Sequence, residues 1–154
     1  MEQGRIRPIA LCLFRHAGRI LVGNAYDAVK QEHYCRPLGG GIEFGERGAE
    51  AIVREIREEL GAEIEGVRPL GILENLFTCE GKAGHEIVLV FDAAFADRSF
   101  YDRAVLHGHE QGAAAPAFTA EWKSLDELAG GSVRLVPEGL AAFLTSQEGE
   151  ECLD

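Results

Sequence analysis

Residues 40–62, which read GGIEFGERGAEAIVREIREELGA, carry the clearest pattern in this chain of 154 residues. After an opening run of glycines, apolar side chains recur with the spacing of one face of an α-helix. Gly61 follows the last of them, where a glycine in the left-handed conformation commonly ends a helix. The stretch therefore predicts an amphipathic helix over about residues 47–60, with a buried face made of Ala49, Ile52, Val53, Ile56 and Leu60.

Three acidic residues, Glu55, Glu58 and Glu59, share another face of this helix, roughly 120° from the apolar stripe at about 100° per residue. Residues three or four positions apart are neighbours on a helix, so these like charges repel one another. A divalent cation such as Mg²⁺ removes the repulsion, because it binds carboxylate oxygens and shares them with substrate phosphates. Arg54 is placed to orient Glu55 or to neutralise part of the cluster. A solvated run of charge is the alternative explanation for the acids alone.

The pattern extends beyond the helix, because Gly40, Glu46 and Gly61 stand at fixed offsets from the acidic residues. It resembles the Nudix box of the Nudix hydrolases, GX5EX7REUXEEXGU, where U is a bulky aliphatic residue. Every fixed position matches, and only Ala62, at the last U position, is smaller than usual. The resemblance implies an α/β fold, a Nudix-type α/β/α sandwich with a mixed β-sheet. The length predicts one domain, which the resemblance identifies as a Nudix hydrolase domain over residues 1–154, and the acidic composition of residues 146–154 predicts a disordered tail.

The resemblance also implies which residues hold the metal. Glu55, Glu58 and Glu59 would ligate Mg²⁺ or Mn²⁺ and act in catalysis, and a backbone carbonyl near Gly40 would join them. Such ions neutralise phosphate oxygens, orient the substrate and lower the pKa of an attacking water. Glu46 and Arg54 would support this metal shell.

The general base stays open between one of the box glutamates and an acid outside the box. Among the outside acids Glu110 is preferred as a further catalytic residue, because some Nudix hydrolases supply an acid from the equivalent loop. Glu121, on a predicted strand, is the second choice. Glu86, expected on the surface of the sheet, is the third.

Nudix hydrolases cleave a diphosphate bond in a nucleoside diphosphate linked to another moiety. The implied substrate is a small phosphorylated nucleotide: a nucleotide sugar, an ADP-ribose-like compound or a nucleoside polyphosphate. Arg36 is a candidate for binding its phosphates, and Tyr34, Phe77 and Trp122 are candidates for stacking on its base. Core packing is the alternative role of each aromatic residue. Residues 77–80, FTCE, lack the proline and the tyrosine typical of two subfamilies, so no subfamily is indicated.

Two other functions compete with hydrolysis. A non-catalytic Nudix-fold nucleotide-binding or regulatory module would be expected to have an eroded box, whereas no box acid is missing here. An enzyme like isopentenyl-diphosphate isomerase, which shares the fold, normally has a longer chain with a catalytic cysteine and glutamate. The intact box favours the hydrolase over both.

Composition narrows the class of protein further. The formal net charge of −11 argues against binding of a nucleic acid duplex, which needs a basic surface. Four widely spaced cysteines, with no CxxC pair, indicate reduced thiols rather than zinc ligands or a disulfide framework. No signal peptide or membrane segment is recognised, so a cytoplasmic protein without membrane contact is expected. The resemblance also allows a homodimer.

Outside the box, the sequence predicts strands at residues 6–14, 20–22, 67–77, 85–96 and 119–123, and helices at 125–129 and 137–145. The continuous apolar run at residues 87–91 indicates that its strand is central in the sheet. Residues 37–41 are expected to form a tight turn, and residues 97–117 a long irregular loop.

Overall fold

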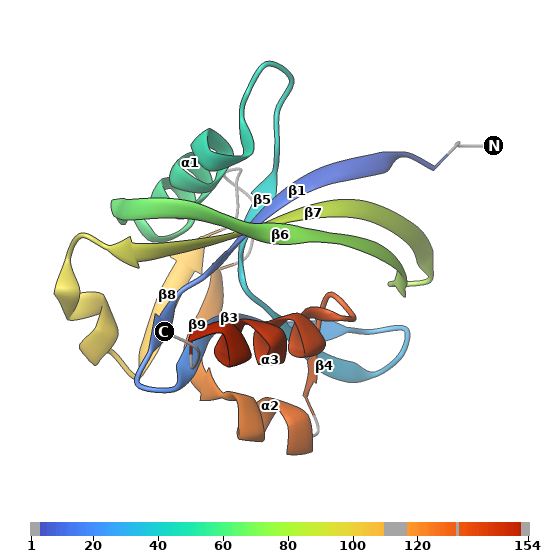
Figure 1. Cartoon of the computed structure of the whole chain (residues 1–154). Helices are drawn as coiled ribbons and strands as arrows, with labels where there is room; N and C mark the ends of the chain where they lie inside the picture. The colour runs from blue at the N-terminus through green and yellow to red at the C-terminus, as the bar shows by residue number, and fades with distance from the viewer. Residues whose placement is uncertain (1–3, 110–116, 132, 152–154) are drawn as a thin grey trace.

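The computed structural model describes residues 4–109, 117–131 and 133–151, with side chains up to residue 146. Within these residues the strands form two sheets (Figure 1). The first sheet has the order β5-β1-β7-β6, in which β1 and β7 are parallel and the other pairs are antiparallel. The predicted mixed sheet is thus confirmed, with strands β1 (Ile6–Leu13), β5 (Leu38–Gly41), β6 (Ile64–Cys79) and β7 (Lys82–Phe95).

The second sheet has the order β10-β4-β3-β9-β8, and the short strand β2 joins it by pairing with β3. Its strands are β2 (Arg15–His16), β3 (Arg19–Asp27), β4 (Glu32–Arg36), β8 (Val105–His109), β9 (Ala117–Ser124) and β10 (Arg134–Leu135). The helices are α1 (Gly48–Leu60), α2 (Leu125–Gly130), α3 (Leu140–Glu151) and a 3-10 turn, η1 (Arg98–Asp102). Among the described residues, none of the helices has the length and apolarity needed to cross a membrane.

The central strand β1 shows how the layers are held together. Its residues alternate between the two faces of the sheet, as strand geometry requires. Ala10 and Cys12 join the apolar cluster that contains Ile52 and Ile56 of α1. Ile9, Leu11 and Leu13 join a second cluster, which contains Leu140 and Leu144 of α3. The first sheet therefore lies between α1 on one side and α3 on the other (Figure 1), which confirms the α/β/α arrangement.

The predicted box helix is confirmed at both ends. Arg47 precedes α1, and its backbone N–H donates to the Glu50 carboxylate at 2.8 Å, which caps the first turn. At the other end Gly61 adopts a φ of 65°, and its N–H donates to the Arg57 carbonyl at 2.9 Å. The glycine therefore ends the helix in the left-handed conformation that the sequence indicates.

Three predictions for other segments need correction. Residues 38–41 form strand β5 rather than a tight turn, because Gly39, with a φ of 149°, lets the backbone lie directly against Ala10; a Cβ there would be 2.0 Å from the Ala10 carbonyl oxygen. The expected irregular loop at residues 97–117 contains η1 and β8. Helix α3 continues to Glu151, through most of the segment expected to be disordered, and residues 152–154 lie outside the described part.

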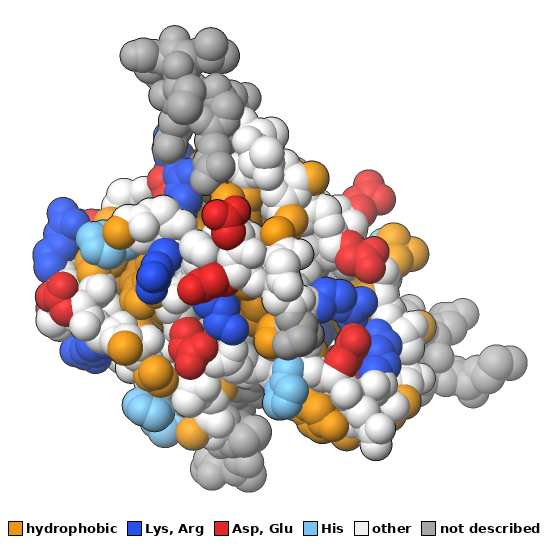
Figure 2. All heavy atoms as spheres, turned by 90° about the horizontal axis from the view of Figure 1, so that it is seen from below, with side chains coloured by type: hydrophobic (Ala, Val, Ile, Leu, Met, Phe, Trp, Pro, Cys, Tyr) orange, Lys and Arg blue, Asp and Glu red, His pale blue; other side chains and the backbone are white. Residues whose placement is uncertain are grey.

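Seen from below, acidic and basic side chains are interspersed over the surface (Figure 2). Apolar side chains appear there as separate small patches. On the described part of this face, neither sign of charge forms a continuous stripe.

Candidate active site

Arg54 is the organising residue of the box. Its Nε and Nη2 atoms donate to the two carboxylate oxygens of Glu46, both at 2.8 Å, and Nη2 also donates to the Gly41 carbonyl at 2.9 Å. Its Nη1 atom donates to Glu55 at 3.0 Å and to Glu58 at 3.1 Å. These bonds raise the pKa of the guanidinium above its usual value, chiefly through the contact with Glu46. One side chain thus connects α1 to the loop before it and to β5.

Gly40 lies against the carboxylate of Glu55. A Cβ at position 40 would lie 2.5 Å from the Glu55 carboxyl carbon and 2.6 Å from each carboxylate oxygen. The Glu55 side chain is only 12% exposed, and this burial is the main cause that raises its pKa, while Arg54 acts in the opposite direction. A buried carboxylate with a raised pKa gains stability from a nearby cation.

We expect the Gly40→Ala substitution to lower kcat at least about 10-fold, because the new methyl group must displace the Glu55 carboxylate. The added carbon meets a side chain rather than the backbone, so the thermal unfolding temperature should change by only a few degrees. Steady-state kinetics and differential scanning fluorimetry measure the two effects. Unchanged kcat would contradict the close contact between Gly40 and Glu55.

The other two box acids occupy different environments. Glu59 is buried, with 9% of its surface exposed, whereas the Glu58 side chain is 31% exposed. Among the described residues, no group of three or more His, Cys, Asp or Glu side chains is already arranged around a common point for a metal ion. The donor chemistry nevertheless fits Mg²⁺ or Mn²⁺: carboxylates of Glu55 and Glu58 share a face with buried Glu59, next to the backbone at Gly40.

The contact between Glu46 and Arg54 makes the stability of the protein depend on pH. The hydrogen bonds from Arg54 are the largest cause that lowers the pKa of Glu46 to about 2, from an ordinary value of 4.5. Because the folded-state pKa lies below the unfolded one, the contact stabilises the protein fully above about pH 4.5. That stabilisation is lost as the pH falls toward about 2.

We therefore expect Glu46→Gln to unfold at lower urea concentration than the wild-type protein at pH 7. The difference between the two unfolding midpoints should shrink as the pH falls from 4.5 toward 2, because the wild-type carboxylate then becomes protonated as well. Urea titrations at pH 7, 4 and 2.5 measure it. A difference that stays constant across this range would contradict the ion pair with Arg54.

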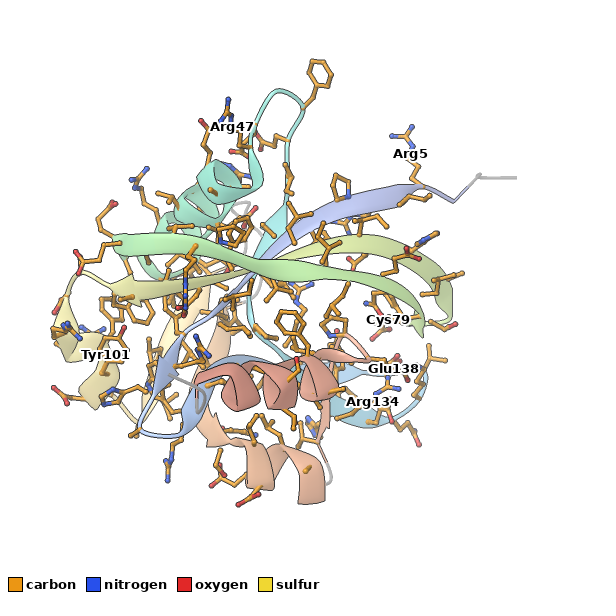
Figure 3. All side chains as sticks on the ribbon, viewed as in Figure 1. Arg5, Arg47, Cys79, Tyr101, Arg134 and Glu138 are labelled. Carbon is orange, nitrogen blue, oxygen red and sulfur yellow. The ribbon has the colours of Figure 1, made fainter. Side chains whose placement is uncertain are left out.

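A cavity of about 790 Å³ lies where the first sheet faces β4 and the segment that leads into α3, over the sheet face opposite α1. Three of the four predicted substrate residues, Tyr34, Arg36 and Phe77, line it. Figure 3 shows Cys79, Arg134 and Glu138 close together at one side of this region.

Arg7 connects the cavity to the box. Its Nη2 atom lies 3.9 Å from the position that a Cβ on Gly41 would take, and the Gly41 carbonyl accepts a hydrogen bond from Arg54.

The fourth predicted substrate residue, Trp122, does not line this cavity. Its ring lies 5.4 Å from that of Tyr101 and 6.1 Å from that of His16, and it packs against the apolar cluster on the α1 side. The structure thus separates Trp122 from Tyr34 and Phe77. Core packing, the alternative weighed for each aromatic residue, describes its surroundings.

The acids considered as a further base fall in three different places. Glu110 lies outside the described residues. Glu121, on β9, has a side chain that is 40% exposed and lies 3.8 Å from the Lys123 ammonium. Glu86 was expected on the sheet surface, and this is wrong: it is buried and lines the cavity beside Arg7 and Asn75.

Sequence reasoning missed the cavity roles of Arg7 and Asn75 and misplaced Glu86. Their positions in the strands were predictable, but the face that borders a cavity depends on how β4 and the segment before α3 pack against the sheet. Arg7 and Asn75 are the strand partners of Glu86 on either side. The signal that could have identified Arg7, Glu86 and Asn75 is the presence of polar residues at directly paired positions of three adjacent strands.

Comparison with known proteins identifies the family. A sequence model of the NUDIX domain matches residues 4–142. The NUDIX hydrolase from Nitrosomonas europaea has a similar structure, with a TM-score of 0.63 at 17% identity over 94% of this chain and 90% of that one. The E. coli ORF135 protein gives a TM-score of 0.59 at 20% identity over 98% and 96%.

A protein described as a UDP-X diphosphatase is also similar, with a TM-score of 0.60 at 17% identity over 97% of this chain and 66% of that one. At these identities the structural likeness shows a shared fold, whereas the domain match shows the family. Because that match spans most of the chain, the protein belongs to the NUDIX family and is a pyrophosphohydrolase.

Proposed function

We propose that this protein hydrolyses a diphosphate bond in a nucleoside diphosphate linked to another moiety, with Mg²⁺ or Mn²⁺ as cofactor. The observation that carries the proposal is the single guanidinium of Arg54, which holds Glu46, Glu55 and Glu58 beside the backbone of β5. The similar protein described as a UDP-X diphosphatase and another described as an ADP compounds hydrolase support this class of substrate.

In this proposal Glu55, Glu58 and Glu59 hold the metal together with the backbone carbonyl at Gly40. When bound, the metal neutralises phosphate oxygens and makes a water more acidic. Arg54 fixes the carboxylates of Glu55 and Glu58, so little reorientation is needed when substrate arrives. The base that accepts the proton of the attacking water is a box glutamate or an acid outside the box.

The cavity, which Arg7 links to the box, would supply the groups that the rest of the substrate needs. Arg7, Lys30, Arg36 and Arg134 line it and would offset the charge of the substrate phosphates. Tyr34 and Phe77 offer aromatic faces for a base. The same lining holds three carboxylates, Asp27, Glu86 and Glu138, so its four cations exceed its acids by one in a chain whose formal net charge is −11.

Product chromatography on a panel of substrates tests the function. The panel contains ADP-ribose, nucleotide sugars, dinucleoside polyphosphates, NADH and nucleoside triphosphates, each with Mg²⁺, Mn²⁺ or EDTA. We expect turnover of at least one class with either metal and loss of turnover in EDTA, restored by adding metal in excess. Silence across the panel, when calorimetry shows that Mn²⁺ binds, would instead favour the non-catalytic nucleotide-binding or regulatory module.

A further inference from the structure

Three polar residues form a row across the floor of the cavity. Arg7 on β1 and Asn75 on β6 are the strand partners of Glu86 on β7, so the three side chains leave the same face of the sheet. All three line the cavity. The row therefore presents a carboxylate between a guanidinium and an amide.

The Glu86 carboxylate is buried and only weakly satisfied by its neighbours. Its side chain is 8% exposed, whereas that of Arg7 is 65% exposed. Asn75 donates to one carboxylate oxygen at 3.4 Å, near the limit of a hydrogen bond, and the Arg7 Nη1 atom lies 3.8 Å from the other oxygen. An ionised carboxylate has about four acceptor sites, and leaving them unfilled under burial is unfavourable. A ligand that brings N–H donors into the cavity would fill them.

An aromatic platform lies beside this row. Phe77 pairs with Gly84, the position two residues before Glu86 on β7. A Cβ on Gly84 would lie 2.3, 2.5 and 2.7 Å from three atoms of the Phe77 ring, so the ring covers the glycine face-on. Phe77 and Glu86 line the same cavity, and both leave the same face of the sheet. A planar base stacked on Phe77 would therefore lie in the cavity that holds the Glu86 carboxylate.

Guanine is the common nucleobase whose edge matches this carboxylate. Its N1–H and N2–H₂ groups are adjacent donors, and a carboxylate can accept both at once. Adenine and cytosine place an acceptor nitrogen beside their amino group, and uracil has one N–H between two carbonyl oxygens. In guanine the O6 acceptor lies next to N1, and the Arg7 guanidinium, 3.8 Å from the Glu86 carboxylate, has N–H donors that could reach it.

We propose that Glu86, positioned by Asn75 and assisted by Arg7, selects guanine, so that the preferred substrates are guanosine diphosphates linked to another moiety. This inference rests on the proposed function for the substrate's diphosphate. Recognition of the base itself needs no hydrolysis. The two can therefore be tested separately.

Binding of nucleoside monophosphates tests base selection, because GMP, AMP, UMP and CMP have no diphosphate bond to cleave. Isothermal titration in Mg²⁺ should show GMP binding at least about 10-fold more tightly than the other three. Glu86→Gln should lower the affinity for GMP about 10- to 100-fold. The same variant should gain at least about 10-fold in affinity for xanthosine monophosphate, because a glutamine amide can accept from N1–H and donate to the O2 atom of xanthine.

Two further variants keep the result interpretable. Glu74→Gln, at an exposed position next to Asn75 on β6, is the matched control and should bind all nucleotides as the wild-type protein does. Arg7→Ala removes a largely exposed side chain, and it should weaken GMP binding about 5-fold more than AMP binding, because loss of any phosphate contact affects both nucleotides equally. The gain for xanthosine monophosphate cannot come from misfolding.

Several outcomes would overturn base selection. Equal affinity for the four monophosphates, or no binding of GMP, would do so. An equal loss for every base in Glu86→Gln would show instead that the carboxylate binds ribose hydroxyls. Hydrolysis of all nucleoside-diphosphate compounds with equal kcat/KM would support the proposed hydrolase activity and contradict base selection. Selective GMP binding without hydrolysis of any diphosphate would support base selection and contradict the proposed hydrolase activity.

Discussion

Replacing Glu59 by glutamine is expected to lower kcat at least about 100-fold while the fold stays intact. Glu59 is buried on the acidic face of α1, and the amide keeps the shape of the carboxylate but lacks its charge. A neutral amide is a poor replacement for a carboxylate that binds Mg²⁺ and could act on the attacking water. The substitution also removes one of three like charges, so thermal stability in EDTA should be unchanged or slightly higher.

Steady-state kinetics over a range of Mn²⁺ concentrations, together with thermal unfolding in EDTA, measures both effects. Glu63→Gln is the matched control, since Glu63 is 59% exposed and contacts Arg57 rather than the box acids. That control should keep its activity within about 2-fold. If Glu59→Gln retained wild-type turnover at unchanged metal dependence, Glu59 would not be a metal ligand.

The box itself was predictable because local chemistry determines it. The apolar stripe, the acidic face and Gly61 lie within 13 residues, so their spacing alone fixes most of their arrangement. The exception is Ala49, which was predicted on the buried face and is exposed, whereas Ala51 is buried. The observed α1 begins within one residue of the predicted start and ends at the predicted residue. The contacts of Arg54 with Glu46 and Glu55 also join residues close in sequence.

Features that depend on distant strands were not predictable in the same way. Strand β8 pairs with β9 through residues eight to sixteen positions away, and Leu106 and Gly108 are its buried residues. Its sequence, VLHGH, hides this alternation, because the exposed Val105 is apolar and the buried Gly108 has no side chain. Glu86 precedes the apolar run of β7, and its burial follows from the elements that close the cavity above it. Sequence periodicity gives a residue's face but not what covers that face.

Trp122 is a second residue whose surroundings could not be predicted from the sequence. The sequence identifies an aromatic residue on a strand, and this placement is compatible with either a substrate site or a core. In the structure β9 pairs with β3 in the second sheet, and the ring lies among His16, Tyr101 and the α1-side cluster. Phe77, an equally plausible candidate by sequence, lies on β6 and reaches the cavity. The pairing of strands, rather than residue type, decides that Phe77 lines the cavity and Trp122 does not.

Arg54→Lys is expected to lower kcat/KM at least about 100-fold, although the positive charge is kept. Arginine presents five N–H donors in a planar fork, whereas the lysine ammonium is a compact charge with three. The guanidinium here bonds the carboxylates of Glu46, Glu55 and Glu58 and the carbonyl of Gly41, a set that one ammonium cannot reach. The carboxylates would lose their fixed orientation and part of the neutralisation of their charge.

The same substitution should make stability depend on metal. We expect Arg54→Lys to lower the free energy of unfolding in EDTA by about 2–3 kcal/mol, because hydrogen bonds to charged groups at a largely buried side chain are lost. Mg²⁺ or Mn²⁺ should restore part of this loss by binding the freed carboxylates. Arg57→Lys, on the same helix but in an exposed pair with Glu63, should change stability little in either condition, because an exposed ion pair is screened by solvent. Urea unfolding of the two variants with and without metal measures the comparison. If Arg54→Lys lost the same free energy of unfolding in EDTA and in metal, Arg54 would stabilise the fold without contributing to the metal site.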